Sequence, residues 1–170
     1  LLEKELHMAI PVYLWLQNEA GDDIRGSVTV HEREGSVELL SLDHKVSMPA
    51  DMNTGKLTGT RVHAPFTFTK EIDAASVYLY KALTKGETFK NAEFRWYRIA
   101  DSGQEILYYS VLLRKVKVVH IVSKMHDIKD PTKEKHNHLE EVQLCYEEIV
   151  WVLHDGNITH MDSWNGRETG

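Results

Sequence analysis

Hydrophobic and polar residues alternate along most of this chain. The clearest runs are VYLWL (12–16), GSVTVH (26–31), GSVELLSLDH (35–44) and AEFRWYRI (92–99). Successive side chains of a β-strand point to opposite faces, so a period of two is typical of a strand with one buried face. The pattern therefore predicts a mainly β protein.

Turn-forming residues separate several of these runs. The segment ADSGQ (100–104) lies between FRWYRI and EILYYSVLL, and HDGN (154–157) lies between EIVWVL and ITHMDSW. Short connections rich in Gly, Asp and Asn are typical of turns between antiparallel strands. We therefore predict two β-hairpins at these positions.

One segment, DAASVYLYKALTKG (73–86), has a helical pattern instead. Asp73 can serve as the N-cap, Gly86 as the stop signal, and Val77, Tyr80 and Leu83 recur at the spacing of one helix face. The residues thus predict a barrel or sandwich of antiparallel strands with one helix packed on it.

The size of the chain favours one domain. It has 170 residues, of which 42% are hydrophobic and 27% charged, as in ordinary globular proteins. Met8 opens MAIPVY, which resembles a natural start more than LLEKELH does. We expect residues 1–7 to be an added or frayed extension, followed by a single domain over residues 8–170.

Charge and hydropathy limit the partners. The formal net charge is −6, and the lysines and arginines are spread along the chain, which argues against nucleic acid as a partner. No apolar run approaches the roughly 18 residues that a membrane helix needs, so we expect no membrane insertion. IPVYLWL (10–16) is also too short for the apolar region of a cleaved signal peptide.

The segment KMHDIKDPTKEKHNHLEE (124–141) is the best candidate for metal chemistry. His136 and His138 would point to the same side of an extended chain, so both imidazoles could bind zinc. A third ligand could come from Asp127, Glu134 or Glu140. The segment also contains Lys124, Lys129, Lys133 and Lys135, whose charges oppose a cation. We favour a solvated loop and assign no metal or other cofactor, with a metal-dependent hydrolase as the alternative.

Other catalytic patterns are absent from the sequence. Cys145 is the only cysteine, so no disulfide can form within the chain, and it lies in a strand-like run where a packed or surface thiol is the usual role. No G-x-S-x-G motif is present, and no pair of carboxylates has the separation of an acid and a base. We assign no catalytic residue and predict that the protein is not an enzyme.

Several long blocks resemble the haemolysin-coregulated protein (Hcp) family of bacterial type VI secretion systems. They are MAIPVYLWL, DHKVSMPADMNTGKLTGTRVHAPFTFTKEID, YLYKALTKGE, KMHDIKDPTKEKHNHLEEV and DGNITHMDSWN, in that order. The resemblance covers nearly all of residues 8–165. It implies a compact antiparallel β-barrel with one flanking α-helix.

The resemblance also implies a function. Family members form hexameric rings that stack into an inner tube, which acts with contractile sheath and spike proteins and carries small effector proteins in its channel. The chain would then reside in the bacterial cytoplasm before firing and leave through the apparatus without a cleaved signal peptide. A monomeric β-sandwich that binds a small ligand is a further alternative.

A polar loop, SMPADMNTGKLTG (47–59), is too long for a tight turn and too polar for a core strand. Six chains would carry 6 × −6 = −36 formal charges, so stacked rings need a local, specific contact to overcome repulsion. We hypothesise that the loop supplies this contact through Asp51, Met52, Asn53, Thr54, Gly55 and Lys56.

Overall fold

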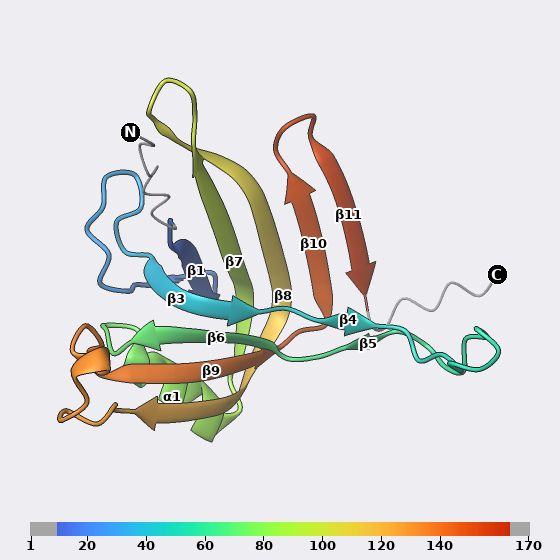
Figure 1. Cartoon of the computed structure of the whole chain (residues 1–170), viewed down its shortest axis with the longest axis horizontal. Coiled ribbons are helices and arrows are strands. Elements are labelled where there is room, and N and C mark those ends of the chain that lie inside the picture. The colour runs from blue at the N-terminus through green and yellow to red at the C-terminus, as the bar shows by residue number, and fades with distance from the viewer. Residues whose placement is uncertain (1–9, 164–170) are drawn as a thin grey trace.

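The computed structural model describes residues 10–163, so the expected extension at residues 1–7 lies outside the described residues (Figure 1). Antiparallel strands make up most of the described chain. The strands are β1 (Val12–Asn18), β2 (Asp23–Ile24), β3 (Val37–Asp43), β4 (Val46–Ser47), β5 (Val62–His63), β6 (Phe66–Glu71), β7 (Thr88–Ile99), β8 (Glu105–Lys124), β9 (Leu139–Cys145), β10 (Glu148–Leu153) and β11 (Ile158–Ser163). The helical elements are α1 (Ser76–Lys85) and a 3₁₀ turn, η1 (Pro131–Lys133).

Six strands close into a barrel in the order β8, β7, β1, β3, β6, β9, with β9 pairing back onto β8. Every strand pair in this barrel is antiparallel. The predicted mainly β class and the barrel with one flanking helix are confirmed.

The long strand β8 pairs with β7 on one side and with two different strands in succession on the other. Its first half pairs with β10, from Tyr109 to Arg114, and its second half pairs with β9 from Lys117 onward. Lys115, between the two, has the left-handed φ of 52° that marks an irregularity in the strand. The β10–β11 hairpin therefore extends from the barrel as a flap (Figure 1).

Both predicted hairpins are present. At 100–104, the Ala100 N–H donates to the Gln104 carbonyl at 2.8 Å and joins β7 to β8. At 154–157, Gly156 and Asn157 take positive φ values of 79° and 51° between β10 and β11. Left-handed backbone is favoured at Gly and tolerated at Asn, so the sequence signal had a direct physical basis.

Aromatic rings fill the barrel. Phe66 and Phe68 project inward from β6, and both contact Phe94 of β7, with the Phe66 and Phe94 rings stacked at 4.1 Å. Leu14 and Leu113 are also fully buried. These residues occupy alternate positions on their strands, as the period of two predicts.

The helix has about the three turns that its pattern predicts, but it begins later than an N-cap at Asp73 would place it and buries a different face. It spans Ser76–Lys85 and ends at Gly86, which is left-handed as expected, but Ala75 holds the N-cap position. The buried residues are Ser76, Leu79 and Ala82. Val77 is 76% exposed and Tyr80 also faces solvent, so of the predicted apolar positions only Leu83 packs against the core. The barrel offers a contact for one face only, and that contact overrides the sequence pattern.

The predicted N-cap Asp73 accepts from the Ala75 N–H at 3.0 Å just before the helix, and it also takes part in a buried ionic cluster. Lys70 of β6 is completely buried, and its Nζ lies 2.7 Å from Glu140 Oε2 of β9 and 2.9 Å from Asp73 Oδ1. The Ser76 hydroxyl donates to Glu140 at 2.9 Å. We call these four residues the Lys70 cluster; it ties the start of α1 to the barrel.

The run at 26–31, predicted as a strand, is an irregular loop. Its backbone makes isolated bonds, such as Gly26 N–H to the Gly35 carbonyl and Gly35 N–H to the Val28 carbonyl, both at 2.9 Å. A Cβ on Gly26 would lie 2.3 Å from the Ser36 carbonyl oxygen, so this close approach requires glycine. Alternation alone was insufficient because the segment lacks a continuous neighbouring strand.

Among the described residues, no helix combines the length and the apolar character needed to cross a membrane.

Candidate functional site

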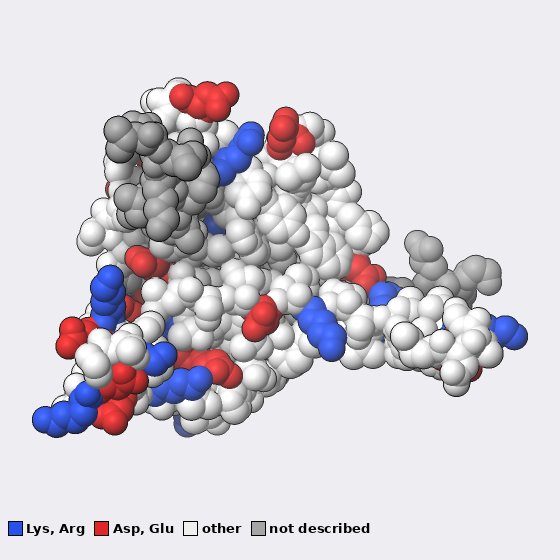
Figure 2. Space-filling view, viewed as in Figure 1, with Lys and Arg blue, Asp and Glu red and all other residues white. Residues whose placement is uncertain are grey.

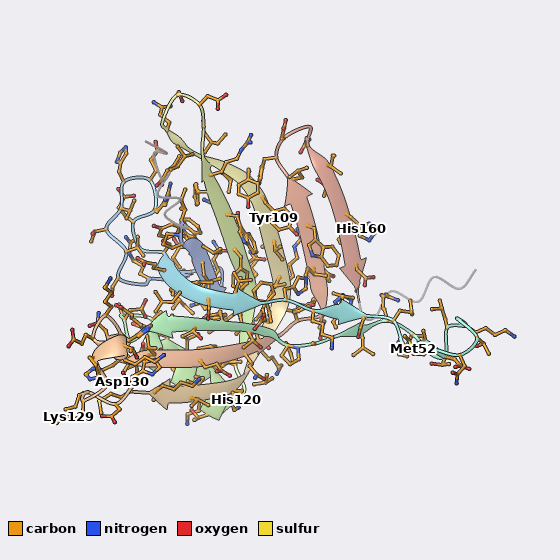
Figure 3. All side chains as sticks on the ribbon, viewed as in Figure 1. Met52, Tyr109, His120, Lys129, Asp130 and His160 are labelled. Carbon is orange, nitrogen blue, oxygen red and sulfur yellow. The ribbon has the colours of Figure 1, made fainter. Side chains whose placement is uncertain are left out.

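A two-stranded ribbon extends away from the barrel between β3 and β6. It comprises residues 44–63, called the arm below, with β4 and β5 at its base and the predicted 47–59 loop beyond them (Figure 1). The arm exposes apolar side chains: Met52 is 93% and Leu57 65% accessible, and Met52 lies well beyond the barrel (Figure 3). The loop prediction is confirmed, and the structure adds that it projects from the molecule.

Local hydrogen bonds hold the tip of the arm in one conformation. The Asn53 N–H donates to the Asp51 carboxylate at 2.9 Å, and the Gly55 N–H donates to the Asp51 carbonyl at 2.8 Å. The Asp51 N–H donates to the Lys56 carbonyl at 2.7 Å, and Gly55 has a left-handed φ of 71°. The bond from Asn53 lowers the pKa of Asp51, so the carboxylate stays charged and the turn remains formed at neutral pH. The tip is preorganised for contact.

A polar cluster fixes the return strand of the arm. His63 Nδ1 lies 2.8 Å from the Tyr146 hydroxyl, and His63 Nε2 lies 2.7 Å from Asp162 Oδ2. Arg61 donates to the same carboxylate at 2.5 Å and lowers the pKa of Asp162. Burial raises the pKa of Tyr146, which therefore stays a neutral hydroxyl. These contacts join the arm to β11 and to the end of β9.

Contacts between aromatic side chains fix the start of the arm, at His44. The Trp151 indole N–H of β10 donates to His44 Nε2 at 3.2 Å, and the His44 ring stacks on Phe66 at 4.9 Å. Burial lowers the pKa of His44, which favours the neutral, accepting imidazole. His160 stacks on Trp151 at 5.8 Å, and Figure 3 shows it on β11. The barrel and the β10–β11 flap thus hold both ends of the arm, at His44 and His63.

Replacing His63 with phenylalanine tests this anchor. The ring stays, but the Tyr146 hydroxyl and the Asp162 carboxylate each lose a hydrogen-bond partner. We expect a loss of about 1–3 kcal/mol in the free energy of unfolding, because the buried Tyr146 hydroxyl loses its partner and Asp162 keeps only Arg61. Hydrogen exchange should also speed up at amides of the arm.

His160→Ala is the matched control, because its exposed ring stacks on the same region without a hydrogen bond in this anchor. We expect it to change the free energy of unfolding by less than about 0.5 kcal/mol. Equal losses for both variants would contradict the hydrogen-bonded anchor.

Residues 125–138 of the histidine-bearing segment 124–141 form a mostly exposed connection between β8 and β9, whereas Leu139 and Glu140 are buried in β9. The connection brings His126 and His136 together, with ring centroids 4.7 Å apart. Asp130 caps η1 by accepting from the Thr132 N–H at 2.9 Å, and Figure 3 shows it beside Lys129 at the end of the barrel remote from the arm. The prediction of a solvated loop is confirmed for residues 125–138 and wrong for Leu139 and Glu140, both of which are buried.

The ligand set proposed for zinc does not come together. Glu140 is buried in the Lys70 cluster, where its carboxylate already binds Lys70 and Ser76. Within residues 10–163, no group of three or more His, Cys, Asp or Glu side chains is arranged to hold a metal ion. Cys145 is exposed at the end of β9, and partial burial raises its thiol pKa, the opposite of an activated nucleophile.

The anchoring residues had no signal in the sequence. His63 bonds to partners 83 and 99 positions away, and Trp151 bonds to His44 across 107 positions. No spacing motif links residues so far apart. Only the hairpin prediction for HDGN hinted that β10 and β11 lie together, and it did not place them beside the arm.

Residues 13–152 match the family model described as "Type VI secretion system effector, Hcp". The chain belongs to the Hcp family. This finding confirms the resemblance inferred from the sequence blocks, and the family's role makes the chain a structural tube protein of type VI secretion and not an enzyme.

Individual relatives support the assignment to the Hcp family. The major exported protein of Pseudomonas aeruginosa is 34% identical over 149 residues, covering 88% of this chain and 87% of the relative. A double mutant of Hcp1 from E. coli EAEC 042 is 56% identical with a TM-score of 0.83, covering 92% and 99% of the two chains. Hcp3 from Pseudomonas aeruginosa is 27% identical with a TM-score of 0.75, with the same coverage. Family and relatives together indicate a secreted protein whose homologues form ring assemblies.

Proposed function

We propose that this Hcp chain forms hexameric rings that stack into a tube through the tip of the arm. The main observation that supports this proposal is the exposed, hydrogen-bonded tip of the arm, with Met52 and Leu57 at its surface. Each ring subunit must use two different surfaces, and a contact of that kind between rings propagates into an open stack. A projecting arm is suited to such a contact.

The charge of the arm supports the same role. Its cations are Lys45, Lys56 and Arg61, and Arg61 is already paired with Asp162; the arm has one carboxylate of its own, Asp51, whereas the whole chain is acidic at −6. Figure 2 shows lysine and arginine side chains along the arm at the right of the molecule. A cationic arm can contact an acidic ring without the repulsion that the net charge would otherwise impose.

The remaining steps follow the family role. The assembled tube would carry small effector proteins in its channel and act with the contractile sheath and spike. The chain would be held in the cytoplasm before firing and leave through the apparatus without a cleaved signal peptide. None of these steps requires catalysis by the chain.

Deleting Asp51–Lys56 tests the stacking role. We expect rings near 117.6 kDa (6 × 19.6 kDa, less the deleted residues) to persist in native mass spectrometry, whereas tubes seen by electron microscopy become much shorter. The physical reason is that the deletion removes the projecting contact and leaves the anchored base in place.

A finer pair of variants controls for the loss of any exposed loop residue. Met52→Ser/Lys56→Ala should shorten tubes, and Ile128→Ser/Lys129→Ala should not, although both remove an exposed apolar side chain and a lysine from a surface loop. Unchanged tube length after the deletion would overturn the stacking role of the arm.

A further inference from the structure

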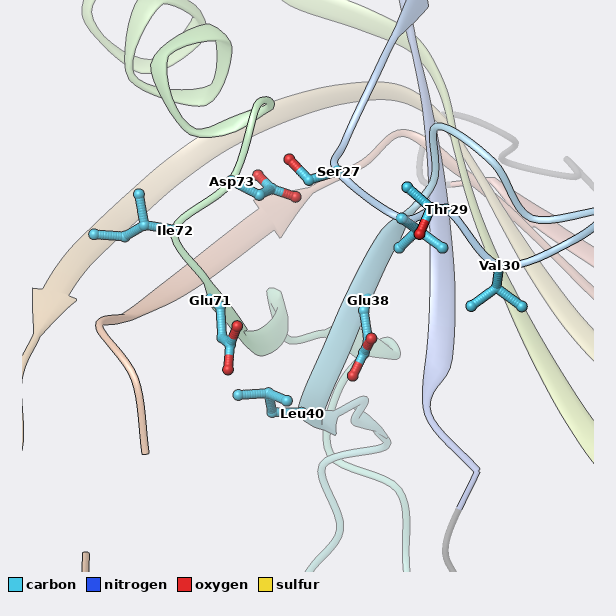
Figure 4. A pocket seen from close by; sticks show the side chains of 9 residues that line it. Ser27, Thr29, Val30, Glu38, Leu40, Glu71, Ile72 and Asp73 are labelled. Carbon is cyan, nitrogen blue, oxygen red and sulfur yellow. The ribbon is translucent and has the colours of Figure 1, made fainter. Parts of the chain in front are cut away.

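A shallow groove lies at the end of β3 and β6 opposite the arm. It is about 250 Å³ in volume and is bordered by the irregular loop 27–30, β3 and the segment after β6 (Figure 4). Three of its apolar lining residues, Val30, Leu40 and Ile72, are 43%, 46% and 53% exposed. The isolated chain therefore leaves an apolar floor in contact with water.

The groove is acidic as well as apolar. Glu38, Glu71 and Asp73 contribute carboxylates to its lining, and none of its lining residues is a lysine or arginine. Asp73 already pairs with Lys70, which it shares with Glu140, and Glu71 accepts a neutral hydrogen bond from Asn137 at 3.0 Å. Glu38 and Glu71 are thus left as exposed carboxylates in an apolar setting, and such a setting favours an added cation.

The tip of the arm has the complementary chemistry. Met52 and Leu57 are its most exposed apolar side chains, and Lys56 lies between them in sequence. The turn at Asp51 fixes their positions before any contact forms, which reduces the entropy lost on binding. A methionine side chain adapts readily to an irregular apolar surface.

The topology prevents the arm from reaching the groove of its own chain. β3 and β6 are antiparallel neighbours, so β3 starts near the groove and ends before the arm, whereas β6 starts after the arm and ends at the groove. The arm and the groove therefore lie at opposite ends of this strand pair, as Figure 1 shows. A contact between them must join two copies, and each copy can donate one arm and receive another.

We propose that the arm tip of one copy docks in this groove of a second copy, with Met52 against Val30, Leu40 and Ile72 and with Lys56 facing Glu38 and Glu71. The proposal rests on the stacking role assigned to the arm above and identifies the surface that receives it. Docking covers the most exposed methionine and the acidic groove at once. Repetition of the same contact gives a stack in which every copy points in the same direction.

Charge exchange tests the electrostatic part of the contact. Lys56→Glu and Glu38→Lys should each raise the protein concentration needed for tube assembly by at least about fivefold, because each places like charges together. The double variant should regain most of the loss. Two losses that simply add in the double variant would overturn the pairing.

Disulfide trapping tests the contact directly, in a Cys145→Ser background. With Met52→Cys and Leu40→Cys in every chain, mild oxidation of assembled tubes should give a ladder of covalent multimers on a non-reducing gel. The control combines Met52→Cys with Val77→Cys, which is 76% exposed on α1 but outside the groove, and should give no ladder.

The outcomes separate this proposal from the proposed function. A ladder in the Leu40 pair alone supports docking in the groove. If tubes form but the Leu40 pair gives no ladder, the groove is not the surface that receives the arm, and a different ligand would have to occupy it. The stacking role of the arm would still stand. Ladders in both pairs indicate random collision and also overturn it. Failure of the unaltered chain to form rings or tubes overturns the proposed function itself.

Discussion

Replacing Lys70 with methionine should cost about 3–5 kcal/mol in the free energy of unfolding. The change removes a completely buried ammonium group that lies 2.7 Å from Glu140 and 2.9 Å from Asp73. Methionine has similar bulk, so the packing loss is small. The Glu140 carboxylate is then left buried with the Ser76 hydroxyl as its remaining donor in the cluster. An uncompensated buried charge is among the most destabilising changes in a protein.

Urea denaturation of Lys70→Met, at one protein concentration below that of ring assembly, measures the loss. Lys124→Met is the matched control, because Lys124 lies 2.9 Å from Glu141 on the same strand as Glu140 but in an exposed pair. It should cost about 0–1 kcal/mol. The double variant Lys70→Met/Glu140→Leu should recover most of the loss, since the fully buried carboxylate is gone as well and only the less buried Asp73 has lost its cation. A Lys70→Met loss below 1 kcal/mol would contradict the role given to the cluster.

Phe94→Ala is expected to cost a similar amount, about 3–5 kcal/mol. Phe94 is fully buried, stacks on Phe66 at 4.1 Å, and makes edge contact with Phe68 at 5.9 Å. Its removal leaves a cavity between β6 and β7 that a closed barrel cannot easily collapse, because each strand is paired on both sides. The aromatic contacts are lost together with the buried apolar area.

Thermal and urea unfolding of Phe94→Ala and Phe94→Leu measure this effect, and leucine should retain part of the stability because it fills part of the space. Ile99→Ala, on the same strand but 61% exposed, should stay within about 0.5 kcal/mol of the unaltered protein. A loss at Phe94→Ala as small as that at Ile99→Ala would mean that the barrel repacks around the missing ring.

The predictions from local pattern succeeded where a local cause was sufficient. The hairpin at 154–157 required left-handed backbone, which Gly156 and Asn157 supply, and the helix stop at Gly86 has the same explanation. They failed where a partner decides the outcome. The run 26–31 alternates like a strand but has no continuous neighbour, and α1 buries Leu79 where the pattern had pointed to Val77.

The candidate chemistry shows the same division. The sequence placed His136, His138 and Glu140 within five residues of one another, which made a zinc site conceivable. In the structure Glu140 turns inward to Lys70, and His136 faces His126 in an exposed loop. Side chains that are close in sequence need not share a face. Which of them meet depends on where the strand β9 begins.

The sequence by itself determined the mainly β class, two hairpins, the end of the helix, the long polar loop and, through several long blocks in the order found in the family, the Hcp resemblance. These features depend on residues within a few positions of one another, or on order along the chain. The tertiary structure decided that the loop projects as an arm, that His44, His63, Trp151 and Asp162 anchor it, and that an acidic apolar groove lies at the opposite end of β3 and β6. Each of these joins residues far apart in sequence, and only the closure of the barrel brings such residues together.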